Sequence, residues 1–256
     1  MNEIDTLELL FGEDYEITDH IKIRQPTLNE IVKFGQSTLN EIVKFGQPHF
    51  GEKRYMNMLS VFVCSPFDMI AQLDMAGIDF TKISNYELFC SLVTSLPQSE
   101  TAILFGETDF TKYKIINTDK GNQLMYKNSV ISEPIYNLMA NCLRKMNNLA
   151  EPKYKKVGNE ETKRKMIEYA YTDLKNAKRR KYKSQLADMV SAATNHPFFK
   201  YGINEVKDMK IYAFFNSLKR INIIEHSHNL STAVYSGSID PSKINKKDFD
   251  WLRSIE

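Results

Sequence analysis

The chain has 256 residues, of which 42% are hydrophobic, 26% are charged and 11% are aromatic. This composition is typical of a folded globular protein and excludes a disordered or fibrous chain. The formal net charge of +2 excludes a chain that is polycationic along its whole length, although basic residues are concentrated locally.

The predicted elements begin with strands. Residues 7–11 and 15–17 flank the turn sequence Gly12-Glu13-Asp14 and predict a β-hairpin. Residues 20–24 alternate between polar and apolar side chains and predict a further strand. The first hairpin is therefore expected over about residues 7–24.

An 11-residue tandem duplication follows. Residues 25–35 read QPTLNEIVKFG, and residues 36–46 read QSTLNEIVKFG. Each copy has a threonine three residues before a glutamate, which is the pattern of a capping box, and each ends in glycine, so each predicts a short helix. Two copies are too few for a solenoid. We interpret the repeat as a local duplication that the fold tolerates at its surface, and the alternative is a doubled binding helix.

Helical patterns and one further hairpin occupy the middle of the chain. Helices are predicted at residues 55–63, 66–75, 84–96, 99–105 and 134–146, from apolar spacing, capping boxes and first-turn prolines. Two strand-like segments around Thr118-Asp119-Lys120-Gly121-Asn122 predict a second hairpin at about residues 112–127. The sequence therefore predicts an α+β fold that is predominantly α-helical, with two small β-hairpins in the N-terminal half.

The polar stretch 147–158 contains a proline and a glycine and is the predicted domain boundary. It separates a mixed α+β domain, residues 1–150, from a helical domain, residues 151–256, which could also pack with the first as one unit. Helices are expected at residues 160–177, 184–194 and 204–234, and a last helical turn near residues 246–252 is expected to dock Trp251.

No motif for catalysis, cofactor binding or metal binding is present. The sequence lacks HExxH, GxGxxG and the Walker A pattern. His226 and His228 are two residues apart on a predicted helix, so their imidazoles point about 200° apart and cannot share a metal ion. Cys64, Cys90 and Cys142 are widely spaced and form no CxxC, which favours buried reduced thiols. We therefore expect a protein that is not an enzyme and has no cofactor.

The sequence also gives no sign of secretion or of a membrane anchor. The first residues, MNEIDTLELLF, are acidic and lack the basic start of a signal peptide. No apolar run approaches the roughly 18 residues that are needed to cross a bilayer. We therefore expect the protein to work in the cytoplasm of the cell that makes it.

Residues 153–183 contain twelve basic and four acidic residues, with tyrosines interleaved. Such a segment can bind nucleic acid through phosphate contacts and stacking, or bind an acidic protein surface, or form a solvated helix face. No named nucleic-acid-binding motif accompanies it. The candidate partner-binding residues are Lys163, Arg164, Lys178, Arg179, Arg180 and Lys181.

Three stretches carry a family resemblance: KRYMNMLSVFVCSPFDMIAQLDMAGIDF (53–80), FKYGINEVKDMKIYAFFNSLKRI (199–221) and YSGSIDPSKINKKDFDWLRSI (235–255). Together they resemble a family of uncharacterised proteins of tailed phages and prophages of Firmicutes. The opening, LFGEDYEITDHIKIRQPTLNEIVKFG (10–35), is similar to the start of phage tail assembly chaperones. In that phage family the duplicated segment occurs once, so the role of residues 36–50 stays open.

The resemblance implies a non-catalytic phage tail-assembly or tail-associated protein that binds another tail protein. Tail assembly chaperones bind the tape-measure protein and keep it soluble until the tail tube polymerises around it. The implied partners are phage tail proteins, with a tape-measure-like protein first among them. The implied place is the host cytoplasm during assembly, and both retention in the virion and association between copies of the chain are compatible with it. The alternative is a nucleic-acid-binding accessory protein that uses residues 153–183.

Overall fold

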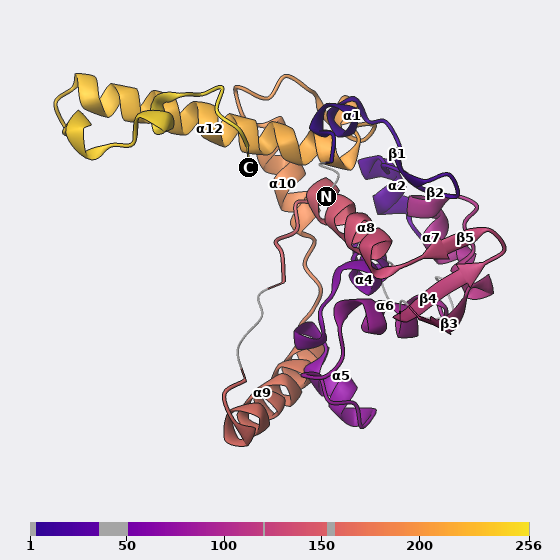
Figure 1. The fold of residues 1–256 in the computed structure, drawn as a ribbon. Coiled ribbons are helices and arrows are strands. Elements are labelled where there is room, and N and C mark those ends of the chain that lie inside the picture. Colours follow the sequence, from indigo (N-terminus) through magenta and orange to yellow (C-terminus); the bar gives the residue numbers. More distant parts are fainter. Residues whose placement is uncertain (1–3, 36–50, 120, 153–156, 256) are drawn as a thin grey trace.

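The structure is a computed structural model that describes residues 4–35, 51–119, 121–152 and 157–255. It confirms the predicted α+β class, because helices predominate and two small antiparallel sheets lie in the N-terminal half (Figure 1). None of the helices in these ranges is long and apolar enough to cross a membrane.

The first element corrects the sequence prediction. Residues 7–11 are helical, within α1 (Thr6–Phe11), rather than the first strand of a hairpin. The Asp5 side chain accepts hydrogen bonds from the backbone N–H groups of Leu7 and Glu8, and Gly12 ends the helix with φ of +80°. Both features are standard helix ends. The hairpin itself is formed by β1 (Tyr15–Thr18) and β2 (Ile21–Ile23).

The first copy of the duplication forms the short helix that the capping box predicts, α2 (Leu28–Lys33). The Thr27 hydroxyl accepts from the Glu30 N–H at 3.1 Å, and the Glu30 carboxylate accepts from the Thr27 N–H at 2.7 Å. Leu28, Ile31 and Phe34 are buried, so this copy contributes to the core. The second copy lies outside the described residues.

The middle helices match the sequence expectations closely. The predicted helix from residue 66 to 75 is divided, because a 3-10 turn precedes a helix that begins at residue 70. The elements are α4 (Gly51–Val63), η1 (Pro66–Asp68), α5 (Ile70–Met75), α6 (Asn85–Val93), α7 (Gln98–Phe105), η2 (Phe110–Lys112) and α8 (Glu133–Met146).

The second hairpin is present and is extended by a strand that the sequence did not predict. β3 (Lys114–Thr118) pairs with β4 (Gly121–Tyr126), which also pairs with β5 (Ser129–Ile131), all antiparallel. Leu124 and Ile131 lie opposite each other and are both buried, so this edge of the sheet packs on the helices.

One apolar core runs through most of the described chain. It extends from Leu9 in α1 to Ile221 and is centred on an aromatic group around Phe62. The ring of Phe62 lies 4.7 Å from that of Phe105 and 5.5 Å from that of Phe110, centroid to centroid. Because the core includes residues on both sides of the predicted boundary at 150, such as Met139 and Phe214, the two segments share buried surface.

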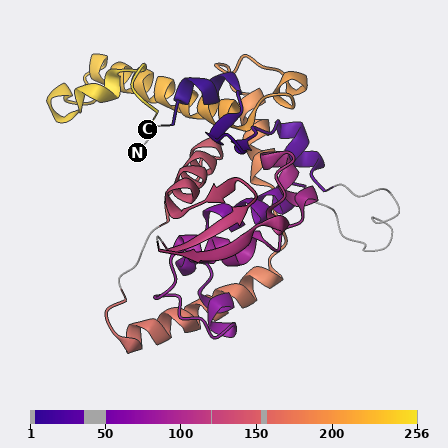
Figure 2. The same cartoon turned by 45° about the vertical axis from the view of Figure 1, so that its right-hand side comes forward.

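The last part of the chain is helical. It contains α9 (Glu160–Arg179), α10 (Gln185–Thr194), α11 (Ile203–Val206), α12 (Ile211–Tyr235), η3 (Pro241–Lys243) and η4 (Lys246–Phe249). α12 projects from the body, and the C-terminal segment runs back along it (Figures 1 and 2). Trp251 does not dock as expected, since 53% of it is exposed. The Arg220 guanidinium instead holds this segment by donating to the backbone carbonyls of Trp251 and Arg253.

The predicted single helix over residues 204–234 is broken at residues 207–210, between α11 and α12. The N-terminal end of α2 pairs with this break through backbone hydrogen bonds. Leu28 N–H donates to the Met209 carbonyl at 3.1 Å, and Ile211 N–H donates to the Pro26 carbonyl at 3.0 Å. Residues 207–209 turn, and Lys210 is extended, with φ of −68° and ψ of 144°, where it forms an antiparallel bridge with Thr27. The Met209 carbonyl and the Ile211 N–H are therefore used in this pairing, and the helix does not continue through the break.

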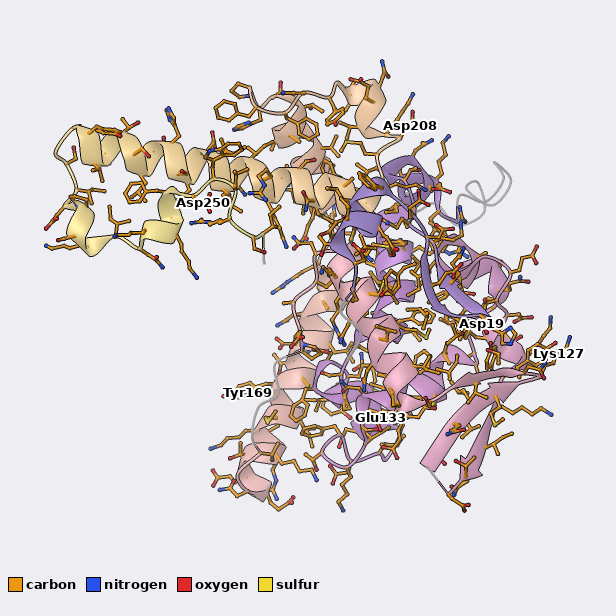
Figure 3. All side chains as sticks on the ribbon, turned by 45° about the horizontal axis from the view of Figure 1, so that its top comes forward. Asp19, Lys127, Glu133, Tyr169, Asp208 and Asp250 are labelled. Atoms are coloured by element: carbon orange, nitrogen blue, oxygen red, sulfur yellow. The ribbon has the colours of Figure 1, made fainter. Side chains whose placement is uncertain are left out.

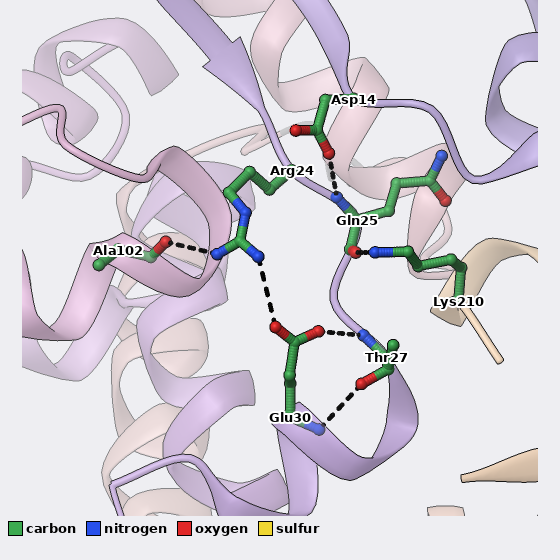
Figure 4. A network of polar contacts seen from close by, with 7 residues as sticks. All are labelled: Asp14, Arg24, Gln25, Thr27, Glu30, Ala102 and Lys210. Carbon is green, nitrogen blue, oxygen red and sulfur yellow. Dashed lines mark hydrogen bonds and ion pairs between the residues drawn. The ribbon is translucent and has the colours of Figure 1, made fainter. Parts of the chain in front are cut away.

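A network of polar side chains also holds the start of α2 against the start of α12 (Figure 4). The Lys210 ammonium donates to the Gln25 carbonyl at 2.7 Å, and the Arg24 guanidinium donates to the Glu30 carboxylate at 3.3 Å. The buried Gln25 amide donates to the carbonyls of Leu9 and Glu13 at 3.0 and 2.8 Å. The network therefore joins α1, α2 and the start of α12.

Candidate functional site

The basic segment singled out in the sequence, residues 153–183, contains the whole of α9. The side chain of Asn159 accepts from the Thr162 N–H at 2.8 Å and starts the helix. Glutamates occupy the first turn and Lys178 and Arg179 the last, so the charges at both ends oppose the helix dipole. Twenty residues at 1.5 Å per residue give a length of about 30 Å.

α9 lies on the outside of the molecule. It has no buried residue, and it packs through Met166, Ile167 and Ala170 on a second, smaller apolar cluster around α5. The buried members of that cluster are Ile70, Leu73, Phe80 and Leu88. Apolar packing therefore covers only a narrow face of α9, and the remaining faces are in solvent.

Two polar contacts fix the N-terminal half of α9 on this cluster. The Lys163 ammonium lies 2.7 Å from an Asp79 carboxylate oxygen, and the Tyr171 hydroxyl donates to Asp74 at 2.9 Å. The Lys163 and Asp79 side chains are only 19% and 24% exposed. The hydrogen bond from Lys163, followed by those from Thr81, holds the pKa of Asp79 well below its usual range.

A third contact fixes the chain after α9. The Glu52 carboxylate, at the start of α4, accepts from the Leu186 N–H at 3.0 Å and from the Ser184 hydroxyl. Burial, together with the neighbouring Glu52 carboxylate, raises the pKa of Tyr182 to about 12. The ammonium of Lys53 lies 5.9 Å from the centre of the Tyr182 ring. The beginning of α10 is therefore attached to α4.

Between these contacts lies a segment that we call the cationic strap, residues 174–183, which contains six basic residues and no acidic one. It is anchored upstream through Lys163 and Tyr171 and downstream through Glu52. Its backbone is helical up to Arg179 and extended at Arg180, which has φ of −77° and ψ of 132°. The strap therefore presents its charges from a supported backbone.

The structure separates the six predicted residues into two groups. Lys163 is committed to Asp79 and is not available to a partner. The other five are exposed, and none forms an ion pair with any acid in the described ranges: Arg164, Lys178, Arg179, Arg180 and Lys181. Lys175 is also exposed, and it lies on the same side of α9 as Arg164, because eleven residues make about three turns.

Tyr169 is the aromatic residue most available beside these charges. It is 69% exposed and points away from the body on the outer side of α9 (Figure 3). Lys165 lies one helical turn before it and pairs with Glu161 at 2.7 Å, so the ring lies beside a solvent-exposed ion pair.

Sequence reasoning missed two polar contacts between distant residues. One is Glu52 with Ser184 and Leu186, described above. The other is an imidazole nitrogen of His196 that lies 2.8 Å from the Glu225 carboxylate and ties the loop after α10 to α12. Glu225 is next to His226, which together with His228 is exposed. No local pattern marks either contact, because the partners are far apart in the sequence.

Two further observations on the described ranges concern metal binding and a pocket. No group of three or more His, Cys, Asp or Glu residues there could hold a metal ion. A pocket of about 290 Å³ lies beside the second sheet. Two pairs of its polar side chains bind each other: Lys112 pairs with Asp109 at 3.1 Å, and the Tyr113 hydroxyl donates to Ser129 at 2.8 Å.

Comparison with known proteins gives one match. Residues 176–256 match the family model described as the YomV second domain. The matched region begins inside the cationic strap and continues through α10, α11, α12 and the C-terminal segment. It covers less than half of the chain and supports the phage-associated part of the resemblance. It bears neither on the likeness to tail chaperones nor on Firmicutes as the source. No curated protein and no solved structure matches the chain.

Proposed function

We propose that this chain is a non-catalytic, phage-associated protein that binds an acidic surface of another phage protein through the cationic strap. The observation that carries the proposal is the row of exposed cations of the strap, held between two anchors on the body. Lys183 pairs with Asp188 at 2.7 Å, and the other five pair with no acid in the described ranges. A supported backbone loses little conformational freedom on binding, so more of the interaction energy remains as affinity. Clustered charge of one sign also accelerates encounter with an oppositely charged surface.

The proposed process is phage tail assembly, with a tail protein such as a tape-measure-like protein as the partner. The resemblance of residues 10–35 to tail assembly chaperones supports this process, and the match of residues 176–256 supports only the coarser statement that the protein is phage-associated. In this proposal the protein is not an enzyme and acts in the host cytoplasm during assembly. Association between copies of the chain is compatible with this role.

Co-expression with the tail proteins of the same phage, followed by co-purification at increasing salt, tests the proposal. The test variant carries Lys178→Glu, Arg179→Glu, Arg180→Glu and Lys181→Glu. The matched control reverses four exposed lysines elsewhere: Lys114→Glu, Lys207→Glu, Lys243→Glu and Lys246→Glu. We expect the test variant to lose the tail protein and the control to retain it. Equal retention by both variants, or binding that ignores salt, would overturn the proposal.

A second candidate function is nucleic-acid binding by the same face, favoured by the exposed ring of Tyr169 beside Lys165. Stacking on an aromatic ring contributes about 1–3 kcal/mol per base. In a gel shift with single-stranded DNA or RNA, this candidate predicts that affinity falls steeply with salt and that Tyr169→Ala weakens binding. If Tyr169→Ala leaves binding unchanged or no complex forms at low salt, this candidate is excluded.

A further inference from the structure

The short helix α1 has two apolar faces, and the described part of the chain covers only one of them. Leu9 points into the core and is fully buried. Leu7, Leu10 and Phe11 are 55%, 40% and 71% exposed. With about 100° between successive residues, these three side chains share one arc of about 100° on the side opposite Leu9. We call these three residues the α1 face.

Large apolar side chains grouped on one side of a helix are a feature of binding surfaces rather than of ordinary protein surface. Isolated exposed apolar residues need no explanation. Here, however, three of five consecutive residues expose such side chains in one direction. The α1 face is therefore a candidate for contact with a partner.

The backbone below the α1 face is firmly held. The Lys145 ammonium donates to the Thr6 hydroxyl at 2.8 Å, and the Gln25 amide donates to the Leu9 carbonyl at 3.0 Å. Asp5 caps the start of α1, and α1 also packs on α12. A partner would therefore meet a preformed surface, which lowers the entropy lost on binding.

The segment that carries the α1 face is acidic, although lysines of other elements reach it. Residues 4–19 contain six carboxylates and no lysine or arginine. All six are exposed: Asp5, Glu8, Glu13, Asp14, Glu16 and Asp19. Lys22 pairs with Glu16 at 2.9 Å, while Lys145 binds Thr6 and Lys210 binds the Gln25 carbonyl. None of these three lysines pairs with Asp5, Glu8, Glu13 or Asp14 in the described ranges. A ligand with apolar side chains and flanking cations would match both properties of this surface.

We infer that the α1 face docks a cationic amphipathic helix of another protein, by apolar contact within an acidic rim. Such helices present apolar residues at i, i+3 and i+4, the spacing needed to lie along Leu7, Leu10 and Phe11. The footprint of a six-residue helix is small, so the contact is weak and reversible when it acts alone. The surface is separate from the cationic strap, because α1 and α9 lie at opposite ends of the body (Figures 1 and 2).

The full chain can be tested with a synthetic helical peptide of leucine and lysine at amphipathic spacing. Two further peptides serve as probes: a scrambled sequence of the same composition and the glutamate version. The test variant is Leu7→Gln, Leu10→Gln and Phe11→Gln. The matched control replaces equally exposed apolar residues elsewhere: Met75→Gln, Ile203→Gln and Leu252→Gln.

We expect the amphipathic lysine peptide to bind the wild type and the control equally, and to bind the test variant at least about tenfold more weakly. Glu8→Gln with Glu13→Gln should also weaken binding. Circular dichroism of each variant confirms that the fold is retained. Equal binding of the scrambled or glutamate peptide would overturn the inference. So would a concentration-dependent dimer that is lost only in the test variant, because the occupant would then be a second copy of the chain.

This inference does not depend on the proposed function, and the two fail separately. The strap variant with four reversed charges should bind the lysine peptide at least as well as the wild type. The α1 test variant should retain the acidic partner of the strap. If the strap variant instead failed to bind the lysine peptide while the α1 variant still bound it, the peptide would not bind at the α1 face and the inference would be wrong.

Discussion

The ammonium of Lys163 lies 2.7 Å from a carboxylate oxygen of Asp79 and joins the first turn of α9 to the loop that follows α5. Because α9 has no buried residue, this contact and the Tyr171–Asp74 hydrogen bond carry much of its attachment. We expect Asp79→Asn to increase amide hydrogen exchange across residues 160–179 several-fold at neutral pH. Asp173→Asn, on the exposed side of the same helix, is the control and should leave exchange unchanged.

The same pair predicts a pH dependence. The pKa of Asp79 is lowered in the folded protein. Its contribution to the free energy of unfolding is therefore complete above the ordinary aspartate pKa of about 3.9 and is lost as the pH falls below that value. The pKa of Lys163 is raised, mainly by its hydrogen bond to Asp79, so its contribution is lost only as the pH rises beyond about 10.4. The difference in the free energy of unfolding between the wild type and Asp79→Asn should therefore be constant between these two pH limits. It should decrease to zero as the pH falls through the lowered pKa of Asp79. A difference that stays undiminished as the pH falls below the ordinary aspartate value would contradict this assignment.

Gln25 should be a sensitive position for stability. It is fully buried, its amide nitrogen donates to two backbone carbonyls, and its side-chain oxygen has no hydrogen-bond partner among the residues that the structure describes. Gln25→Ala leaves the Leu9 and Glu13 carbonyls without this donor and opens a cavity, so we expect a loss of about 2–4 kcal/mol in the free energy of unfolding. Urea denaturation measures it. Gln98→Ala removes one exposed bond to a backbone carbonyl and should cost less than about 1 kcal/mol. A similar loss for both variants would show that burial at Gln25 is not decisive.

Glu52 caps a helix that begins more than a hundred residues later. Glu52→Gln weakens its hydrogen bonds to the Ser184 hydroxyl and the Leu186 N–H, so we expect a loss of about 1 kcal/mol and faster exchange in the first turn of α10. The variant should also lower the pKa of Tyr182, though not to its ordinary value, because burial is the larger cause of the shift. Glu133→Gln, in the exposed first turn of α8, is the control. An unchanged Tyr182 titration would argue against the contact.

The three cysteines should react slowly in the native protein. Burial raises the pKa of Cys64 and of Cys90 to about 11 and that of Cys142 to about 12. At pH 8 their thiolate fractions are then about a hundredfold or more below that of a free thiol with a pKa near 8.5. Alkylation followed by mass spectrometry should show slow modification in buffer and fast modification in urea. Fast modification of any one of them in buffer would place that thiol at the surface.

Much of the fold follows from local sequence. The capping boxes at Thr27–Glu30 and Ser84–Glu87 mark helix starts correctly, because both partners lie within four residues and need no help from the rest of the chain. The strand prediction at residues 7–11 failed because a six-residue helix with apolar residues on two sides shows no clear period of either kind.

What the sequence could not supply depends on distant partners. β5 is a three-residue strand that exists through its pairing with β4. The break between α11 and α12 is set by hydrogen bonds to Pro26, Leu28 and Asn29, about 180 residues earlier, while the apolar spacing continues through it. In the candidate site, the basic composition was visible in the sequence. The commitment of Lys163 to Asp79 was not, because nothing near either residue indicates that they meet.

The hydrogen bonds between residues 207–211 and 26–29 also have a consequence for how the gene evolves. The region that matches a family model, residues 176–256, is bound to two elements earlier in the chain. Backbone hydrogen bonds join it to the start of α2, and the Glu52 carboxylate joins it to α4. A recombination event that exchanged residues 176–256 alone would replace residues 207–211. The new residues would then have to pair with residues 26–29 of a chain with which they had not evolved. The two halves of the gene should therefore evolve together, and changes in residues 26–29 should be compensated by changes in residues 207–211.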